Sequence, residues 1–176
     1  MTGSQSETGI SVPPTRDRTI ETLITLLLQA EDAGQRFYLR LMETFAHEPT
    51  AAEVWWTMGA DEAGHIRLLE QVLHSLPPEQ LQAPADPLWL EQARSAARFS
   101  PERTLARIQT LEDAYQEAHA LETSEINAVF EFVMTEYFPK SLQRSFVLNL
   151  LRTHVERLER LRTPEWRRSI VVKTSS

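Results

Sequence analysis

The chain contains no cysteine, which excludes disulfide bonds, thiolate metal sites, iron–sulfur clusters and thiol catalysis. Glycine is scarce, at five of 176 residues, and no alternating strand pattern persists. No apolar run reaches transmembrane length, and the polar residues 1–17 lack the apolar core of a signal peptide. The net charge of −7 argues against a nucleic-acid surface. We therefore expect a cytoplasmic protein with no membrane or nucleic-acid partner.

The length corresponds to one domain and is sufficient to bury a core without cross-links. Apolar residues recur at spacings of three and four along most of the chain, which is typical of amphipathic helices. We expect a flexible N-terminal segment over 1–18, a helical domain over 19–162 and a C-terminal tail over 163–176.

Four main helices are predicted, over about 19–46, 50–74 and 100–137 and from Pro139 to about 162. Thr50 and Glu53 match a capping box at the start of the second helix. The segment 76–99 contains four prolines, so we interpret it as a crossover with a short helix over 88–98. The short, long and short connections predict an all-α four-helix bundle, with two antiparallel helix pairs joined by a long crossover.

Glu62 and His65 lie three residues apart in the second helix. At this spacing a carboxylate and an imidazole leave the same helix face, and both side chains are ligands for iron or manganese. Their face is otherwise apolar, since Val54, Met58 and Leu69 share it. Charge buried there is costly unless a cation or a partner compensates it.

The other helices also carry potential ligands on their inner stripes. These are Glu31 in the first helix, Glu122 and Glu125 in the third, and His154 in the fourth; Tyr38 lies one heptad after Glu31. The segment from His65 resembles the segment from His154, so the second helix pair looks like a diverged copy of the first. In this copy Leu151 replaces the glutamate of the second Glu-x-x-His motif.

Each candidate also has a simpler interpretation. Glu31 fits a solvated residue at the edge of its stripe, and Glu122 and Glu125 lie in a glutamate-rich stretch that fits a surface. His154 fits a core histidine bonded to a backbone carbonyl, and Tyr38 fits packing. The metal-site hypothesis depends on a coincidence: all six candidate ligands fall at corresponding positions along the helices of two similar helix pairs.

The chain resembles the rubrerythrin-like branch of the ferritin-like di-iron carboxylate family over about 19–162. The resemblance is carried by Glu31 with Phe37-Tyr38, Glu62-x-x-His65, Glu122-x-x-Glu125 and His154. The family takes one glutamate from each of two helices and Glu-x-x-His from each of the other two. Three features depart from it. Leu151 replaces a bridging glutamate, Phe130 stands where rubrerythrins often have tyrosine, and the lack of cysteine leaves no rubredoxin module.

The resemblance implies a cofactor of two iron ions, or of one if Leu151 removes the second site, with manganese as the alternative metal. The implied ligands are Glu31, Glu62, His65, Glu122, Glu125 and His154, with Tyr38 as a catalytic residue beside them. The first metal keeps the fuller ligand set, so we expect it to bind more strongly. The implied partners are a second copy, forming a homodimer, and an external electron-donor protein.

Two functions follow from different classes. The first is an iron-binding, rubrerythrin-like oxidoreductase that acts on peroxide, O2 or ferrous iron. The alternative is a non-catalytic helical bundle with a degenerate or mononuclear metal site that serves as an interaction module, and Leu151 favours it. A ferritin-like iron store is a third, weaker hypothesis, because it requires a hollow shell.

Overall fold

The computed structural model describes residues 16–124, 126–138, 156–158 and 161. Within them the chain is mainly helical and forms no strand beyond an isolated bridge between Thr19 and Pro84, which confirms the all-α class. The elements are η1 (Arg16–Arg18), α1 (Ile20–Thr44), α2 (Pro49–Ser75), α3 (Pro78–Leu81), α4 (Pro87–Ala96), α5 (Pro101–Leu105), α6 (Leu111–Glu122) and α7 (Ile126–Tyr137). None of the helices in this part of the chain is long and apolar enough to cross a bilayer.

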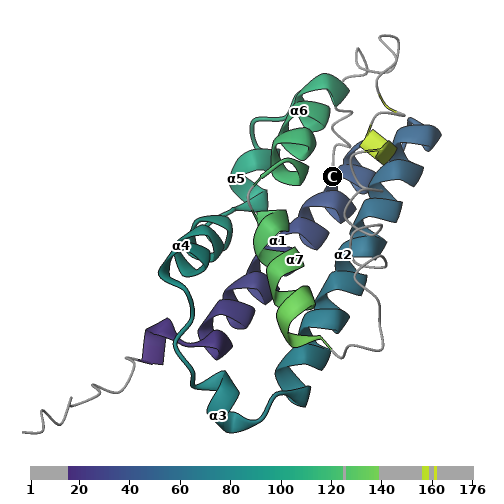
Figure 1. Ribbon diagram of the computed structural model, residues 1–176. Helices are drawn as coiled ribbons and strands as arrows, with labels where there is room; N and C mark the ends of the chain where they lie inside the picture. Colours follow the sequence, from purple (N-terminus) through teal and green to yellow (C-terminus); the bar gives the residue numbers. More distant parts are fainter. Residues whose placement is uncertain (1–15, 125, 139–155, 159–160, 162–176) are drawn as a thin grey trace, which may run out of the picture.

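The two longest helices, α1 and α2, run side by side in opposite directions (Figure 1). The hydroxyl of Thr19 caps α1 by accepting a hydrogen bond from the amide of Thr22 at 3.2 Å. Helix α2 begins at Pro49 and has no side-chain cap. The predicted cap at Thr50 is therefore wrong: proline is pre-organised for the first helical position, so Thr50 already lies inside the helix.

The predicted single helix over 100–137 is also wrong, because the structure divides it into α5, α6 and α7. Helix α6 starts afresh at a capping box formed by Thr110 and Asp113. It ends where the hydroxyls of Thr123 and Ser124 donate to backbone carbonyls of its last turn at 2.7 and 2.6 Å. Such side-chain bonds to the backbone compete with the backbone hydrogen bonds of a helix. Helix α6 therefore ends here, and α7 begins as a separate helix.

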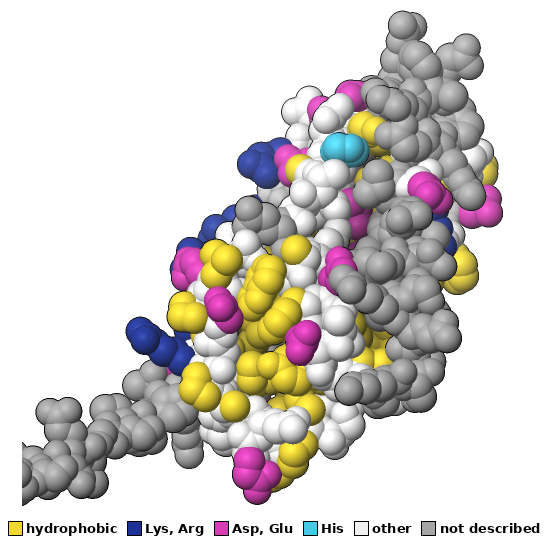
Figure 2. Space-filling view, in the orientation of Figure 1, with side chains coloured by type: hydrophobic (Ala, Val, Ile, Leu, Met, Phe, Trp, Pro, Cys, Tyr) yellow, Lys and Arg dark blue, Asp and Glu magenta, His cyan; other side chains and the backbone are white. Residues whose placement is uncertain are grey.

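The crossover contains the expected short helix, now α4, which packs against α1 and α7. Asp86 caps it by accepting from the amide of Leu88 at 2.7 Å. Hydrophobic side chains gather on the face around α4 and the lower part of α7 (Figure 2). There the rings of Trp89 and Phe132 stack with centroids 5.3 Å apart, so the crossover helix covers α7 by aromatic packing.

Two apolar cores fill the interior. The lower core contains Ile20, Leu23, Ile24, Leu27, Leu69, Val72, Ala85, Leu90, Ala93, Val129, Phe130, Val133, Met134 and Phe138. The upper core contains Phe37, Tyr38, Leu41, Phe45, Ala51, Val54, Trp55, Met58, Ile108, Leu111, Ala114, Tyr115, Ala118, Leu158 and Leu161. Each of α1, α2 and the α6–α7 segment passes from one core to the other, and the residues between the cores are therefore buried in the middle of the molecule.

The segment after α7 returns to the upper core at the few positions that the structure describes. Leu158 and Leu161 are fully buried there, and Arg157 pairs with Asp61 of α2. The remainder of the predicted fourth helix lies outside the described residues.

Candidate metal centre

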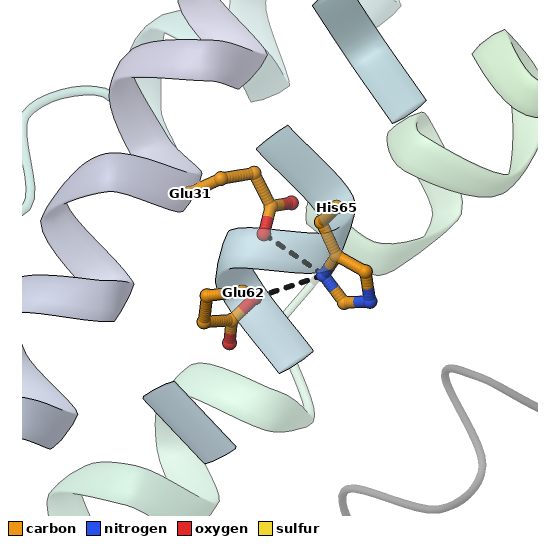
Figure 3. A group of neighbouring side chains, drawn as sticks. All are labelled: Glu31, Glu62 and His65. Atoms are coloured by element: carbon orange, nitrogen blue, oxygen red, sulfur yellow. Dashed lines mark hydrogen bonds and ion pairs between the residues drawn. The ribbon is translucent and has the colours of Figure 1, made fainter. Parts of the chain in front are cut away.

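Glu31 of α1 and Glu62 and His65 of α2 point toward one another (Figure 3). Nδ1 of His65 lies 3.0 Å from Oε2 of Glu31 and 2.8 Å from Oε2 of Glu62. One ligand atom from each of the three residues lies within 4.8 Å of the others. Two carboxylate oxygens and an imidazole nitrogen therefore converge on a volume that can hold one metal ion.

This group is almost inaccessible to solvent. The exposed fractions are 8% for Glu31, 5% for Glu62 and 2% for His65. On α1 and α2 these residues occupy the positions between the lower and upper cores, where the helical stripe predicts apolar side chains. Burial of two carboxylates in such a place requires a compensating positive charge or protonation.

Glu122 ends α6 at the same level and is also buried, at 6% exposure. Together with Glu31 and Glu62 it lines a cavity of about 30 Å³. That volume exceeds the roughly 10–15 Å³ that a single water requires. No lysine or arginine is among the described residues that line this cavity. Three carboxyl groups from three helices thus line one small cavity.

Tyr38 holds Glu122 in place. Its hydroxyl donates a buried hydrogen bond of 2.5 Å to Oε1 of Glu122. Burial raises the pKa of Tyr38 well above its ordinary value of 10.0, and the negative charges of Glu122 and Glu62 raise this pKa further. Tyr38 therefore stays protonated at neutral pH and acts as a hydrogen-bond donor. Its ring stacks on that of Trp55, with centroids 6.2 Å apart, which fixes the direction of the hydroxyl.

Phe130 of α7 packs against the imidazole of His65, with ring centroids 4.6 Å apart. Phe130 has no exposed surface, so this contact closes the histidine side of the group with apolar surface. An imidazole held between an aromatic ring and two carboxylates has little rotational freedom, and its Nδ1 stays directed at the acids.

The structure brings together three of the six predicted ligands, Glu31, Glu62 and His65, as one group. Glu122 lies on the wall of the same cavity but outside that group. The predicted catalytic residue Tyr38 contacts Glu122. The other predicted ligands, Glu125 and His154, lie outside the described residues, as does Leu151.

Two further residues of the site were not predicted. Gly34 lines the cavity, and a β-carbon there would lie 3.7 Å from Oε1 of Glu62. Glycine inside a helix is costly, so its place three residues after Glu31 is a signal that the sequence offers. Asn127 also lines the cavity and donates from Nδ2 to the backbone carbonyl of Glu122 at 2.5 Å. The bond crosses the break between α6 and α7, which helical periodicity did not predict.

The donor set fits a divalent cation of the first transition row, because carboxylate oxygen with imidazole nitrogen suits iron, manganese or zinc, whereas soft copper(I) selects sulfur ligands. A bound cation would also offset the charge of the buried acids. No protein-family model matches the sequence, and comparisons with curated proteins and with solved structures find no significant match.

Proposed function

We propose that this protein is a ferritin-like metal-binding protein whose buried acids hold iron between the two apolar cores. The observation that carries the proposal is the convergence of Glu31, Glu62 and His65 from two helices, with their ligand atoms within 4.8 Å of one another. The burial of these three side chains supports a structural or redox metal site, since buried charge is tolerated where a cation compensates it.

Glu31, Glu62 and His65 hold the first ion in this proposal. Glu122, on the same cavity, belongs to a second ion and is oriented by Tyr38. Glu125 and His154 complete the two ligand sets as predicted from the sequence. The first ion has more ligands than the second, because Leu151 stands in place of a bridging carboxylate.

The proposed activity is that of a rubrerythrin-like oxidoreductase acting on peroxide, O2 or ferrous iron. A reduced pair of irons supplies two electrons, which with two protons convert one peroxide into two waters. The residues of the chain bind the metal, exclude bulk water through the two cores, and keep a protonated phenol at Glu122. Removing water strengthens every electrostatic contact inside the cavity.

The proposed architecture is a four-helix bundle of two antiparallel pairs. Support comes from the α1–α2 pair (Figure 1) and from the crossover that carries α4. It also comes from the burial of Leu158 and Leu161 in the upper core, where a fourth helix would pack. In this architecture α6 and α7 together take the place of the third helix, with a break at the level of the metal site.

An enzyme of this kind needs an electron donor. The proposal takes this donor to be a separate protein. It also includes a homodimer, as the resemblance to rubrerythrins implies.

A mononuclear, non-catalytic site is the second candidate. The observation that favours it is that the converging group comprises three residues, enough for one ion. Under this alternative the bundle serves as an interaction module and the metal stabilises its fold.

Metal titration separates these functions. We expect one to two ferrous ions per chain after anaerobic reconstitution, with peroxide turnover accompanying the second ion. One ion without turnover supports the alternative, and binding far below one ion per chain contradicts both. Glu62→Gln should abolish iron-dependent stabilisation, which reaches about 2.7 kcal/mol at a free metal concentration of 100 times Kd. Glu70→Gln makes the same change at an exposed position of α2 and should retain it.

A further inference from the structure

Two cavities of the described part of the chain meet at a shared wall. The inner one is the carboxylate cavity of about 30 Å³. The outer one has a volume of about 370 Å³ and lies between α4 and α6, where the exposed residues Ser95 and Ala120 line it. Ala96, Phe99 and Leu121 line both cavities. Among the described residues, these three are the ones that the two linings share.

The outer cavity carries oxygen atoms that suit a partly hydrated cation. They belong to Ser95, Glu117 and Ser124, which line it. Glu117 lies 3.3 Å from Arg107, so the outer cavity has little net charge of its own. In the proposed metal site the attraction would come from the inner end, where Glu31, Glu62 and Glu122 line the carboxylate cavity.

We propose that the outer cavity is the path by which a divalent cation reaches the carboxylate cavity, and that Ala96, Phe99 and Leu121 form its gate. This inference rests on the proposed metal site. Phe99 is fixed, because its ring packs edge-on against Phe37 with centroids 5.5 Å apart. Ala96 has only a methyl group. Leu121 is half-buried in the last turn of α6, and a change of its rotamer is the motion that opens the wall.

The rate of metal loading tests the gate separately from the metal site. Co²⁺ is mixed with the metal-free full chain in a stopped-flow instrument, its absorption follows coordination, and dialysis gives the final stoichiometry. Ala96→Phe should slow loading by roughly tenfold or more. Because Ala96 also lines the inner cavity, the rate is normalised to the final stoichiometry, which separates slower entry from lost sites. Ala97→Phe adds the same bulk at the next residue, which lines neither cavity, and should stay within about twofold of the wild type.

Leu121→Ala provides a test in the opposite direction, which remains available if Ala96→Phe does not fold. It removes the mobile side chain and should speed both loading and release of Co²⁺. Unchanged loading rates in Ala96→Phe and Leu121→Ala, with normal stoichiometry, would overturn the gate and leave the metal site intact. Absence of Co²⁺ binding by the wild type would overturn the metal site and the gate together.

Discussion

The hydroxyl of Tyr38 in α1 donates a 2.5 Å hydrogen bond to the carboxylate of Glu122 at the end of α6. The bond is buried and joins residues 84 positions apart in the chain. Because α6 breaks immediately after Glu122, the last helical turn alone does not fix this carboxylate. The hydrogen bond from Tyr38 thus fixes the position of the Glu122 carboxylate, which a continuous helix would otherwise help to hold.

Tyr38→Phe should destabilise the protein by about 1–3 kcal/mol, because a buried acceptor loses its donor. The midpoint of urea unfolding measures this loss. The same variant should weaken a second metal more than the first, since the group of Glu31, Glu62 and His65 does not contain Glu122. Tyr137→Phe is the control, at a half-buried position of α7, and should change stability by less than about 0.5 kcal/mol. A similar loss in both variants would contradict a special role for Tyr38.

Stability should fall as the pH rises above about 10. The unfolded chain releases the tyrosine proton near this pH, whereas burial and the charge of Glu122 keep the pKa of Tyr38 higher in the folded protein. The folded state then binds more protons than the unfolded state, so each pH unit costs at most about 1.4 kcal/mol until the pH reaches the folded pKa. Urea unfolding between pH 9 and 11 measures the slope. Tyr38→Phe should reduce the slope and leave the part that comes from Tyr137, whose pKa is also raised by burial. An equal slope in the variant would contradict the assignment.

Gly34→Ala should change stability and metal affinity in opposite directions. Alanine is favoured over glycine inside a helix by about 1 kcal/mol, and its β-carbon would meet Glu62 at ordinary contact distances of 3.7–3.8 Å. The metal-free protein should therefore melt about 2–4 °C higher. The added methyl group, however, lies in the carboxylate cavity, and we expect metal affinity to fall about tenfold.

Gly64→Ala is the matched control for that experiment. Gly64 also lies inside a long helix, and the nearest atom to a β-carbon there is the Arg67 guanidinium, at 3.9 Å. The control should gain helix stability without loss of metal affinity, as calorimetric melting and metal titration would show. Reduced affinity in both variants would indicate that helix rigidity, and not the cavity, controls binding.

Helical periodicity was sufficient to place the buried acids. Glu31, Glu62, His65 and Glu122 all interrupt apolar stripes in the sequence, and all four are buried, because spacing along a regular helix fixes which face a side chain occupies. Periodicity could not predict the break after α6, since local bonds of Thr123 and Ser124 produce it.

The partner of Tyr38 was also beyond prediction from the sequence. Its hydroxyl could have pointed into the cavity or to any acid at the same depth. The choice of Glu122 depends on how α6 packs against α1, and this packing follows from the tertiary fold and not from either helix alone. The resemblance to rubrerythrins implied a place for Tyr38 beside the proposed metal ligands, but only the structure assigns its hydrogen bond to Glu122.

Leu151→Glu tests the proposed repeat of the two helix pairs. Leu151 precedes His154 by three residues, as Glu62 precedes His65, so a glutamate there restores the second Glu-x-x-His motif. If the register is correct, the second ion should bind more tightly than in the wild type, so that iron content at subsaturating iron rises toward about two ions per chain. Leu150→Glu introduces the same charge one residue away, off the predicted inner stripe, and should leave stoichiometry unchanged. Elemental analysis after anaerobic reconstitution measures both. An equal iron content in the two variants would show that the second helix pair does not repeat the first at the metal site.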